Sequence, residues 1–158
     1  PMVYGCAIDV FNTEDISAGC IFRNNLLKLD RHVTMADDGG LQTLHVKNGR
    51  PGDLFLFLSY SGIHYDYSKY AAALSERGIK PCLITAFSDS ALARQCDTVL
   101  LIPKSERVIG KVANYSSMIS LTYTLQVIYS LIFNQDYQEN YRVKHEADSF
   151  IFTSFAEI

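Results

Sequence analysis

The sequence contains no tryptophan, only four prolines and no cluster of positive charge. Its 14 Lys and Arg residues are scattered among 17 Asp and Glu residues, and the net charge at pH 7 is -3. Proteins that bind nucleic acid directly concentrate Lys and Arg on one surface to neutralise phosphates. This chain has no such pattern, so we expect it to make no direct contact with DNA.

The sequence also lacks a recognised metal-binding or disulfide motif. No C-x-x-C or H-x-x-x-H spacing occurs, and no Cys lies beside a His. The isolated residues are Cys6, Cys20, Cys82, Cys96, His32, His45, His64 and His145. We therefore expect reduced thiols, no metal and no cofactor.

No signal-peptide pattern opens the sequence, which predicts a cytoplasmic protein. An uncharged stretch, residues 112–135, is long enough to cross a bilayer, but hydroxyl and amide side chains interrupt it repeatedly. Its apolar residues recur at steps of three and four: Met118, Leu121, Leu125, Ile128 and Ile132. This spacing predicts a helix that is buried or faces another subunit, and it argues against a membrane partner.

Alternating apolar runs and helical patterns predict an α/β domain. The expected strands are Met2–Ile8, Arg31–Met35, Leu54–Leu58, Ile79–Thr85 and Thr98–Ile102. The expected helices are Phe11–Leu29, Leu41–Val46, Tyr67–Arg77, Ser90–Gln95 and Val112–Phe133. Continuous apolar strands are typical of a parallel sheet covered on both faces. We predict a three-layer αβα sandwich whose five-stranded parallel sheet has the flavodoxin-like order.

The domain is expected to occupy residues 1–135, followed by a C-terminal extension, 136–158. The end of that extension, Asp148–Ile158, is rich in β-favouring Phe and Ile. This segment has three possible places: an added strand at a sheet edge, a position against the core, or a contact with another subunit. The sequence does not decide among them.

Ligands of such sheets bind beyond the carboxyl ends of the strands, where the strand order reverses. Three predicted loops lie there: Gly5–Asp9, Ser59–His64 and Pro103–Glu106. The second carries Ser59-Tyr60-Ser61-Gly62 between a strand and a helix. Free N–H groups at a helix N-terminus, two hydroxyls and a glycine are suited to binding an anion such as phosphate. The serines alone would also suit a simple helix cap and turn.

The order of short motifs resembles that of the sugar isomerase (SIS) domain over roughly residues 3–133. These motifs are Gly52-Asp53, Ser59–Gly62, Arg77-Gly78-Ile79, Ile84-Thr85, Asp89–Ala93, Cys96-Asp97 and Glu106. Within that superfamily, the sequence is most similar to the phosphosugar-binding domains of RpiR-family transcriptional regulators. Those regulators carry a helix-turn-helix domain, and this chain contains none.

The resemblance implies that Ser59, the Tyr60 backbone, Ser61, Gly62 and His64 form a phosphate cradle. His64 replaces a Thr that is usual in the family. Gly5 and Cys6 would belong to the family's first ligand loop, in which Ala7 and Asp9 depart from the Gly and Ser of the pattern.

Glu106 corresponds to a glutamate that serves as the base in SIS isomerases. In a sensor domain, the same residue would contact the sugar. It could instead pair with Lys104, Arg107 or Lys111 at a helix start.

The leading hypothesis is the phosphosugar-sensing domain of an RpiR-type regulator, which would reach DNA only through a helix-turn-helix absent from this chain. The alternatives are an aldose–ketose phosphosugar isomerase that uses Glu106, and a degenerate SIS module retained for oligomerisation. A homo-oligomer, dimer or tetramer, formed through helix 112–133 is expected in each case.

Overall fold

The computed structural model describes residues 8–12, 16–36 and 38–155. The elements, in chain order, are β1 (Ile8–Asn12), α1 (Ile16–Leu27), β2 (Val33–Met35), α2 (Gly39–Asn48), β3 (Leu54–Leu58), α3 (Tyr65–Glu76), β4 (Pro81–Thr85), the short 3₁₀ helix η1 (Ala93–Gln95), β5 (Thr98–Leu101), α4 (Tyr115–Gln135) and α5 (Tyr137–Phe155).

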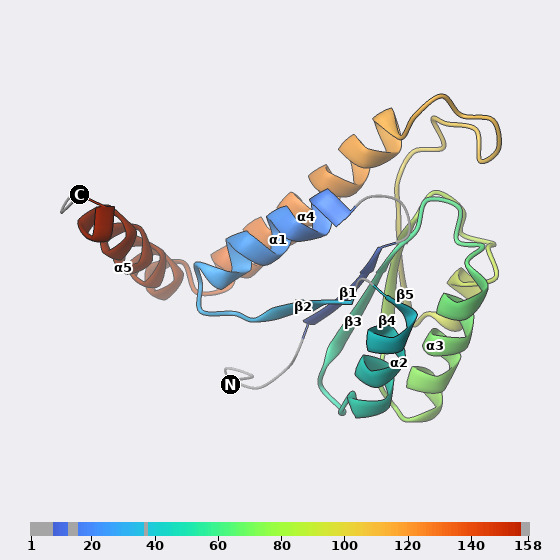
Figure 1. The fold of residues 1–158 in the computed structure, drawn as a ribbon, viewed down its shortest axis with the longest axis horizontal. Coiled ribbons are helices and arrows are strands. Elements are labelled where there is room, and N and C mark those ends of the chain that lie inside the picture. Colours follow the sequence, from blue (N-terminus) through green and yellow to red (C-terminus); the bar gives the residue numbers. More distant parts are fainter. Residues whose placement is uncertain (1–7, 13–15, 37, 156–158) are drawn as a thin grey trace.

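The strands form one parallel sheet in the order β2-β1-β3-β4-β5. Helices α1 and α4 cover one face, and α2 and α3 cover the other (Figure 1). The α/β class with a parallel sheet is therefore confirmed. The direction of winding reverses between β1 and β3, so their carboxyl ends define the edge at which a ligand is expected.

Strand β3 supplies both halves of the core. Leu56 and Leu58 pack in one buried cluster with residues of α1 and α4, and Phe55 and Phe57 pack in the other with residues of α2 and α3. All four side chains are at most 2% exposed. A strand with no solvent-facing side explains why its sequence is apolar at every position.

The first strand continues past its predicted end at Ile8. Ile8 pairs with Val33 and Leu54, and β1 continues to Asn12, so Asp9 is part of the strand. The predicted loop Gly5–Asp9 is therefore wrong as the segment that follows β1. Gly5 and Cys6 lie outside the described residues. The prediction ended the strand too early because the polar residues Asp9 and Asn12 interrupt its apolar pattern.

The segment Ser90–Gln95 is not the helix that was predicted. Only Ala93–Gln95 is helical, as the single 3₁₀ turn η1. The Ser90 hydroxyl accepts a hydrogen bond from the Ala93 N–H at 3.2 Å, which caps this turn. The rest of the segment packs against the Ser59–Gly62 turn and does not form a helix, because the Leu92 N–H donates to the Gly62 carbonyl.

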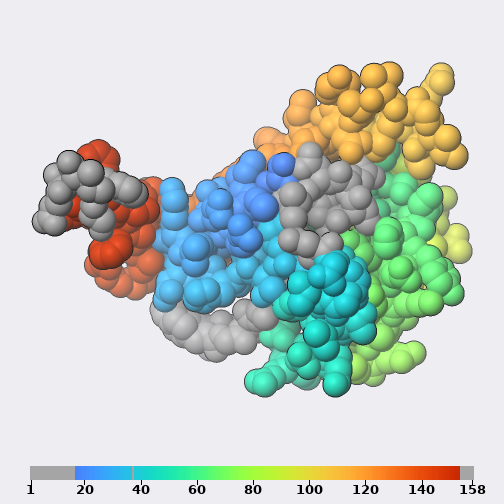
Figure 2. Space-filling model, viewed as in Figure 1, coloured from blue at the N-terminus to red at the C-terminus, as the bar shows by residue number. Residues whose placement is uncertain are grey.

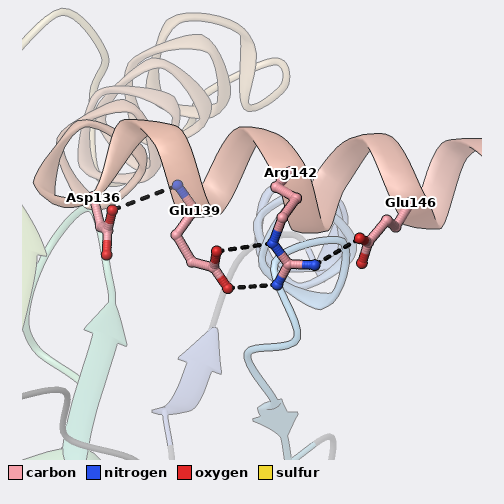
Figure 3. Close-up of polar contacts among 4 residues, drawn as sticks. All are labelled: Asp136, Glu139, Arg142 and Glu146. Carbon is pink, nitrogen blue, oxygen red and sulfur yellow. Dashed lines mark hydrogen bonds and ion pairs between the residues drawn. The ribbon is translucent and has the colours of Figure 1, made fainter.

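The C-terminal segment is helical, so the added strand at a sheet edge is wrong. Ion pairs one helical turn apart support α5: Arg142 binds Glu139 and Glu146, each at 2.6 Å (Figure 3). Lys144 pairs with Asp148 in the same way at 2.5 Å. Extending an existing helix costs less than starting a new element, so the β-favouring residues near position 150 continue α5.

Helix α5 is attached to the domain near its first turns and then projects from it (Figures 1 and 2). The buried Asn140 amide donates to the carbonyls of Ile132 and Phe133, which are in the last turns of α4. Lys28, just after α1, lies 3.8 Å from Asp148. The extension therefore packs on the domain at the end of the α1–α4 layer.

Helix α4 is the one helix in the described part of the chain that is long and apolar enough to cross a membrane. Its inner residues Leu121 and Leu125 are buried in the core beside α1. A core helix of a soluble protein passes the same test of length and hydropathy, but only 17% of the apolar window of α4 is buried.

Candidate functional site

The turn Ser59–Gly62 follows β3 at the carboxyl edge of the sheet. The Ser59 N–H extends the strand pairing by donating to the Ile84 carbonyl at 3.1 Å. The Tyr60 carbonyl accepts two bonds of 3.0 Å, from the Ala86 N–H and the buried Thr85 hydroxyl. The carbonyl side of the turn is thereby fixed to the end of β4.

Position 62 requires a glycine. Its φ is +63°, in the left-handed region, and a Cβ there would lie 2.2 Å from the Ser90 Oγ. The Gly62 N–H donates to the Ser59 hydroxyl, and its carbonyl accepts from the Leu92 N–H. The turn is thus pressed against the chain that follows β4, and no side chain fits between them.

Other donors of the turn belong to residues that range from the buried Tyr60 to the exposed Ile63. Within the described part of the chain, the N–H groups of Tyr60, Ser61 and Ile63 and the Ser61 hydroxyl have no hydrogen-bond partner. The first turn of α3 follows directly, and its cap residue His64 makes no side-chain bond to it. Unpaired N–H groups beside a positive helix end bind anions.

His64 is exposed beside this turn. Its ring lies against that of Tyr67, with 4.3 Å between centroids. Tyr67 is buried, which raises its pKa to about 12, and its hydroxyl accepts a hydrogen bond from the Gln42 amide. The structure therefore brings together Ser59, the Tyr60 backbone, Ser61, Gly62 and His64, as the sequence predicted for one loop.

Glu106 lies near this edge, but its carboxylate binds the start of α4. Oε1 accepts from the Ser116 hydroxyl at 3.0 Å and the Ser117 N–H at 2.9 Å, and Oε2 accepts from the Ser117 hydroxyl at 2.7 Å. Burial acts to raise the pKa of Glu106, but these hydrogen bonds outweigh it and lower the pKa to about 2. A carboxylate with so low a pKa is a weak base near neutral pH.

Three side chains that build the site had no role in the prediction from sequence. Thr85 and Ser90 are buried and hold the turn from beneath, and the Tyr60 ring is buried on its inner side. The run of motifs contained all three residues, but their contacts span 25 to 46 positions. Local spacing does not reveal such contacts.

The described residues contain no group of three or more His, Cys, Asp or Glu side chains placed to hold a metal ion. Burial raises the pKa of the Cys82 thiol to about 11 and, as the largest cause, that of Cys96 to about 12. Both thiols are therefore protonated near neutral pH and are poor nucleophiles.

We predict that Gly62→Ala lowers the free energy of unfolding by about 2–4 kcal/mol, because it adds a clash to the cost of a left-handed alanine. Gly78→Ala is the matched control: Gly78 has a φ of +73° and nothing within 4 Å of an added Cβ. It should lose only about 1–2 kcal/mol. Urea denaturation measures both, and equal losses would contradict the close approach to Ser90.

We predict that Glu106→Gln destabilises the protein by about 1–2 kcal/mol at pH 7, because it weakens charge-assisted hydrogen bonds at the start of α4. The folded pKa lies below the unfolded one, so this stabilisation is present above the unfolded value of 4.5 and is lost as the pH falls toward about 2. The gap between wild type and variant in urea denaturation should therefore close across that window. The exposed Glu76→Gln serves as control, and a gap that is constant with pH would contradict the prediction.

The fold is shared with solved structures of low sequence identity. The sugar isomerase domain of an RpiR transcription factor from Sphaerobacter thermophilus is 23% identical, with a TM-score of 0.75, and the match covers 92% of this chain and 79% of that one. The Vibrio vulnificus NanR protein complexed with ManNAc-6P is 17% identical, with a TM-score of 0.79 over 94% of this chain. The match covers 56% of the NanR chain, so this chain spans little more than half of the length of that protein.

A putative phosphosugar isomerase involved in capsule formation from Bacteroides fragilis is 15% identical, with a TM-score of 0.72. That match covers 87% of this chain and 76% of the isomerase. No curated protein matches the sequence. The SIS domain family model matches residues 26–132, which is more than half of the chain. The chain therefore belongs to the SIS domain family.

Proposed function

We propose that this chain is the phosphosugar-binding sensor domain of a cytoplasmic RpiR-type transcriptional regulator. The observation that carries the proposal is the turn Ser59–Gly62, which is fixed to β4 and has unpaired N–H and hydroxyl donors just before α3. The RpiR and NanR structures share this fold, and NanR was solved with a phosphosugar. A helix-turn-helix outside this chain would make the contact with DNA.

In this proposal, the phosphate lies against the turn and the first N–H groups of α3. Ser59 and Ser61 donate through their hydroxyls, Tyr60 donates through its backbone, and Gly62 allows the close approach. His64 at the exposed edge adds an imidazole donor, which is stronger when it is protonated. Unpaired N–H and hydroxyl donors beside a helix N-terminus favour an oxyanion over an unphosphorylated sugar.

The second candidate is an aldose–ketose phosphosugar isomerase, which the fold of the Bacteroides fragilis protein supports. It requires Glu106 as the base. Because three hydrogen bonds fix the Glu106 carboxylate on α4 and lower its pKa, a sensor is the better assignment. Interconversion of aldose and ketose phosphates that is lost in Glu106→Gln would reverse this preference.

We also propose that the domain forms a homodimer through the outer face of α4. Apolar side chains occur there at intervals of four residues or multiples of four, which places them along one side of the helix. The exposed members are Tyr115, Ile119, Tyr123, Val127 and Leu131. No charged residue occurs on α4, so this stripe, hereafter the α4 stripe, is suited to face a second copy of itself.

We expect ManNAc-6P or a related hexose or pentose phosphate to raise the melting temperature. A ligand at one hundred times its dissociation constant adds about 2.7 kcal/mol of stability. Ser61→Ala should reduce this shift, whereas Ser75→Ala, near the other end of α3, should not. The unphosphorylated sugars are the ligand controls. No shift with any phosphosugar would contradict the sensor and isomerase assignments and favour the degenerate oligomerisation module.

For the dimer, we predict that Ile119→Asp shifts the protein to monomer in sedimentation velocity, because it places a charge in the middle of the α4 stripe. Ile119 is 70% exposed in the single chain, so folding should be retained. Phe152→Asp on α5 is the matched control, since Phe152 is also exposed but lies off the stripe. A wild type that sediments as a monomer would contradict the proposal.

A further inference from the structure

The Tyr60 side chain lies beneath the proposed ligand turn and points away from it. Tyr60 has no solvent-exposed surface, and its ring meets Phe87 edge-on, with 5.8 Å between centroids. The Lys111 ammonium lies 5.6 Å from the centre of the same ring. The side chain of this residue therefore faces the segment that leads to α4, whereas the unpaired N–H groups of Ser61 and Ile63 follow it in the same turn.

The Tyr60 hydroxyl makes two hydrogen bonds to the backbone of one residue. It donates to the Glu106 carbonyl at 2.9 Å and accepts from the Glu106 N–H at 2.8 Å. A pair of bonds with opposite direction fixes both the position and the orientation of the Glu106 backbone. Removal of this oxygen would leave both backbone groups of Glu106 without these bonds.

The Glu106 side chain extends the connection to α4. Its carboxylate accepts from the hydroxyls of Ser116 and Ser117 and from the Ser117 N–H, all in the first turn of the helix. The N-cap residue, Asn114, makes no side-chain bond to this turn. The first turn of α4 is therefore capped by a residue that Tyr60 positions.

Exposed apolar residues lie beside the hydrogen bonds between Glu106 and the first turn of α4. Tyr115 and Ile119, the first two members of the α4 stripe, are each 70% exposed. Between Glu106 and α4, Ile109 and Val112 expose 87% and 95% of their surface. Tyr60 thus holds, through Glu106, both the start of this connecting segment and the helix turn at its end.

We infer that Tyr60 is a positioning residue that couples occupancy of the ligand turn to the start of α4 and the adjoining part of its stripe. A phosphate bound by the Ser61 and Ile63 N–H groups fixes the turn that continues directly from Tyr60, and the Tyr60 ring fixes Glu106. By thermodynamic reciprocity, dimer formation at the stripe then changes ligand affinity by the same factor. This inference rests on the proposed function for its ligand and its dimer, whereas the connection itself requires neither.

The first test needs no ligand. In amide hydrogen exchange of the full chain, Tyr60→Phe should speed exchange of the Ser117 N–H by about tenfold relative to wild type, since the cap loses its support. The matched control is Tyr67→Phe, which removes a buried hydroxyl on the other face of the sheet and leaves Glu106 untouched. The Leu83 amide in β4 reports any global loss of stability in each protein.

Unchanged exchange at Ser117 in Tyr60→Phe, or equal acceleration in Tyr67→Phe, would overturn the inference. The second test adds ManNAc-6P and measures the dimer dissociation constant by sedimentation. The phosphosugar should change this constant in wild type and Tyr67→Phe and leave it unchanged in Tyr60→Phe. An equal change in all three proteins would also overturn it. If ManNAc-6P does not change the dimer dissociation constant of wild type, ManNAc-6P is not the ligand. The hydrogen-exchange result alone then tests the link from Tyr60 through Glu106 to α4.

Discussion

The candidate site depends on which polar groups of the Ser59–Gly62 turn are hydrogen-bonded and which are not. The Tyr60 carbonyl is bonded to Ala86 and Thr85, and Gly62 is bonded to Ser59 and Leu92. These bonds fix the turn and, within the described residues, leave the Ser61 and Ile63 N–H groups and the Ser61 hydroxyl unpaired. Buried polar groups must be satisfied, whereas exposed N–H groups at a helix start are free to bind an anion. The same arrangement therefore stabilises the turn and creates its binding surface.

The sheet dictates where this surface lies. From β1 the chain moves to β2 on one side, and from β3 it moves to β4 and β5 on the other. Because β1 and β3 are neighbours, the turn after β3 lies where the strand order reverses. Phe55 and Phe57 anchor β3 on one face, and Leu56 and Leu58 anchor it on the other. The turn is thus supported by a strand that is buried on both sides, which preorganises its donors before a ligand arrives.

The sequence predicted the elements whose signals are local. The limits of β3 were correct because five apolar residues lie between a breaker cluster and Ser59, and the Ser59–His64 loop followed from a strand, a glycine and a helix in succession. The prediction failed where distant contacts decide: β1 includes the polar Asp9, and the chain around η1 packs against Gly62. For the C-terminal segment the sequence left three placements open, and α5 extends through its β-favouring residues to Phe155. The role of Glu106 as a cap was also hidden, since it depends on residues ten and eleven positions away.

The α1–α4 layer has a consequence for the order in which the protein is built on the ribosome. The Asn25 amide donates to Gln126 across 101 positions, and Phe22 and Leu26 share their buried cluster with Leu121 and Leu125. The described cluster on the face that carries α2 and α3 has all of its members once β5 has been synthesised. The other face stays open until α4 emerges, several seconds later at the usual rate of elongation. During that interval the nascent chain exposes the apolar side of α1, and this face is where a chaperone would bind it.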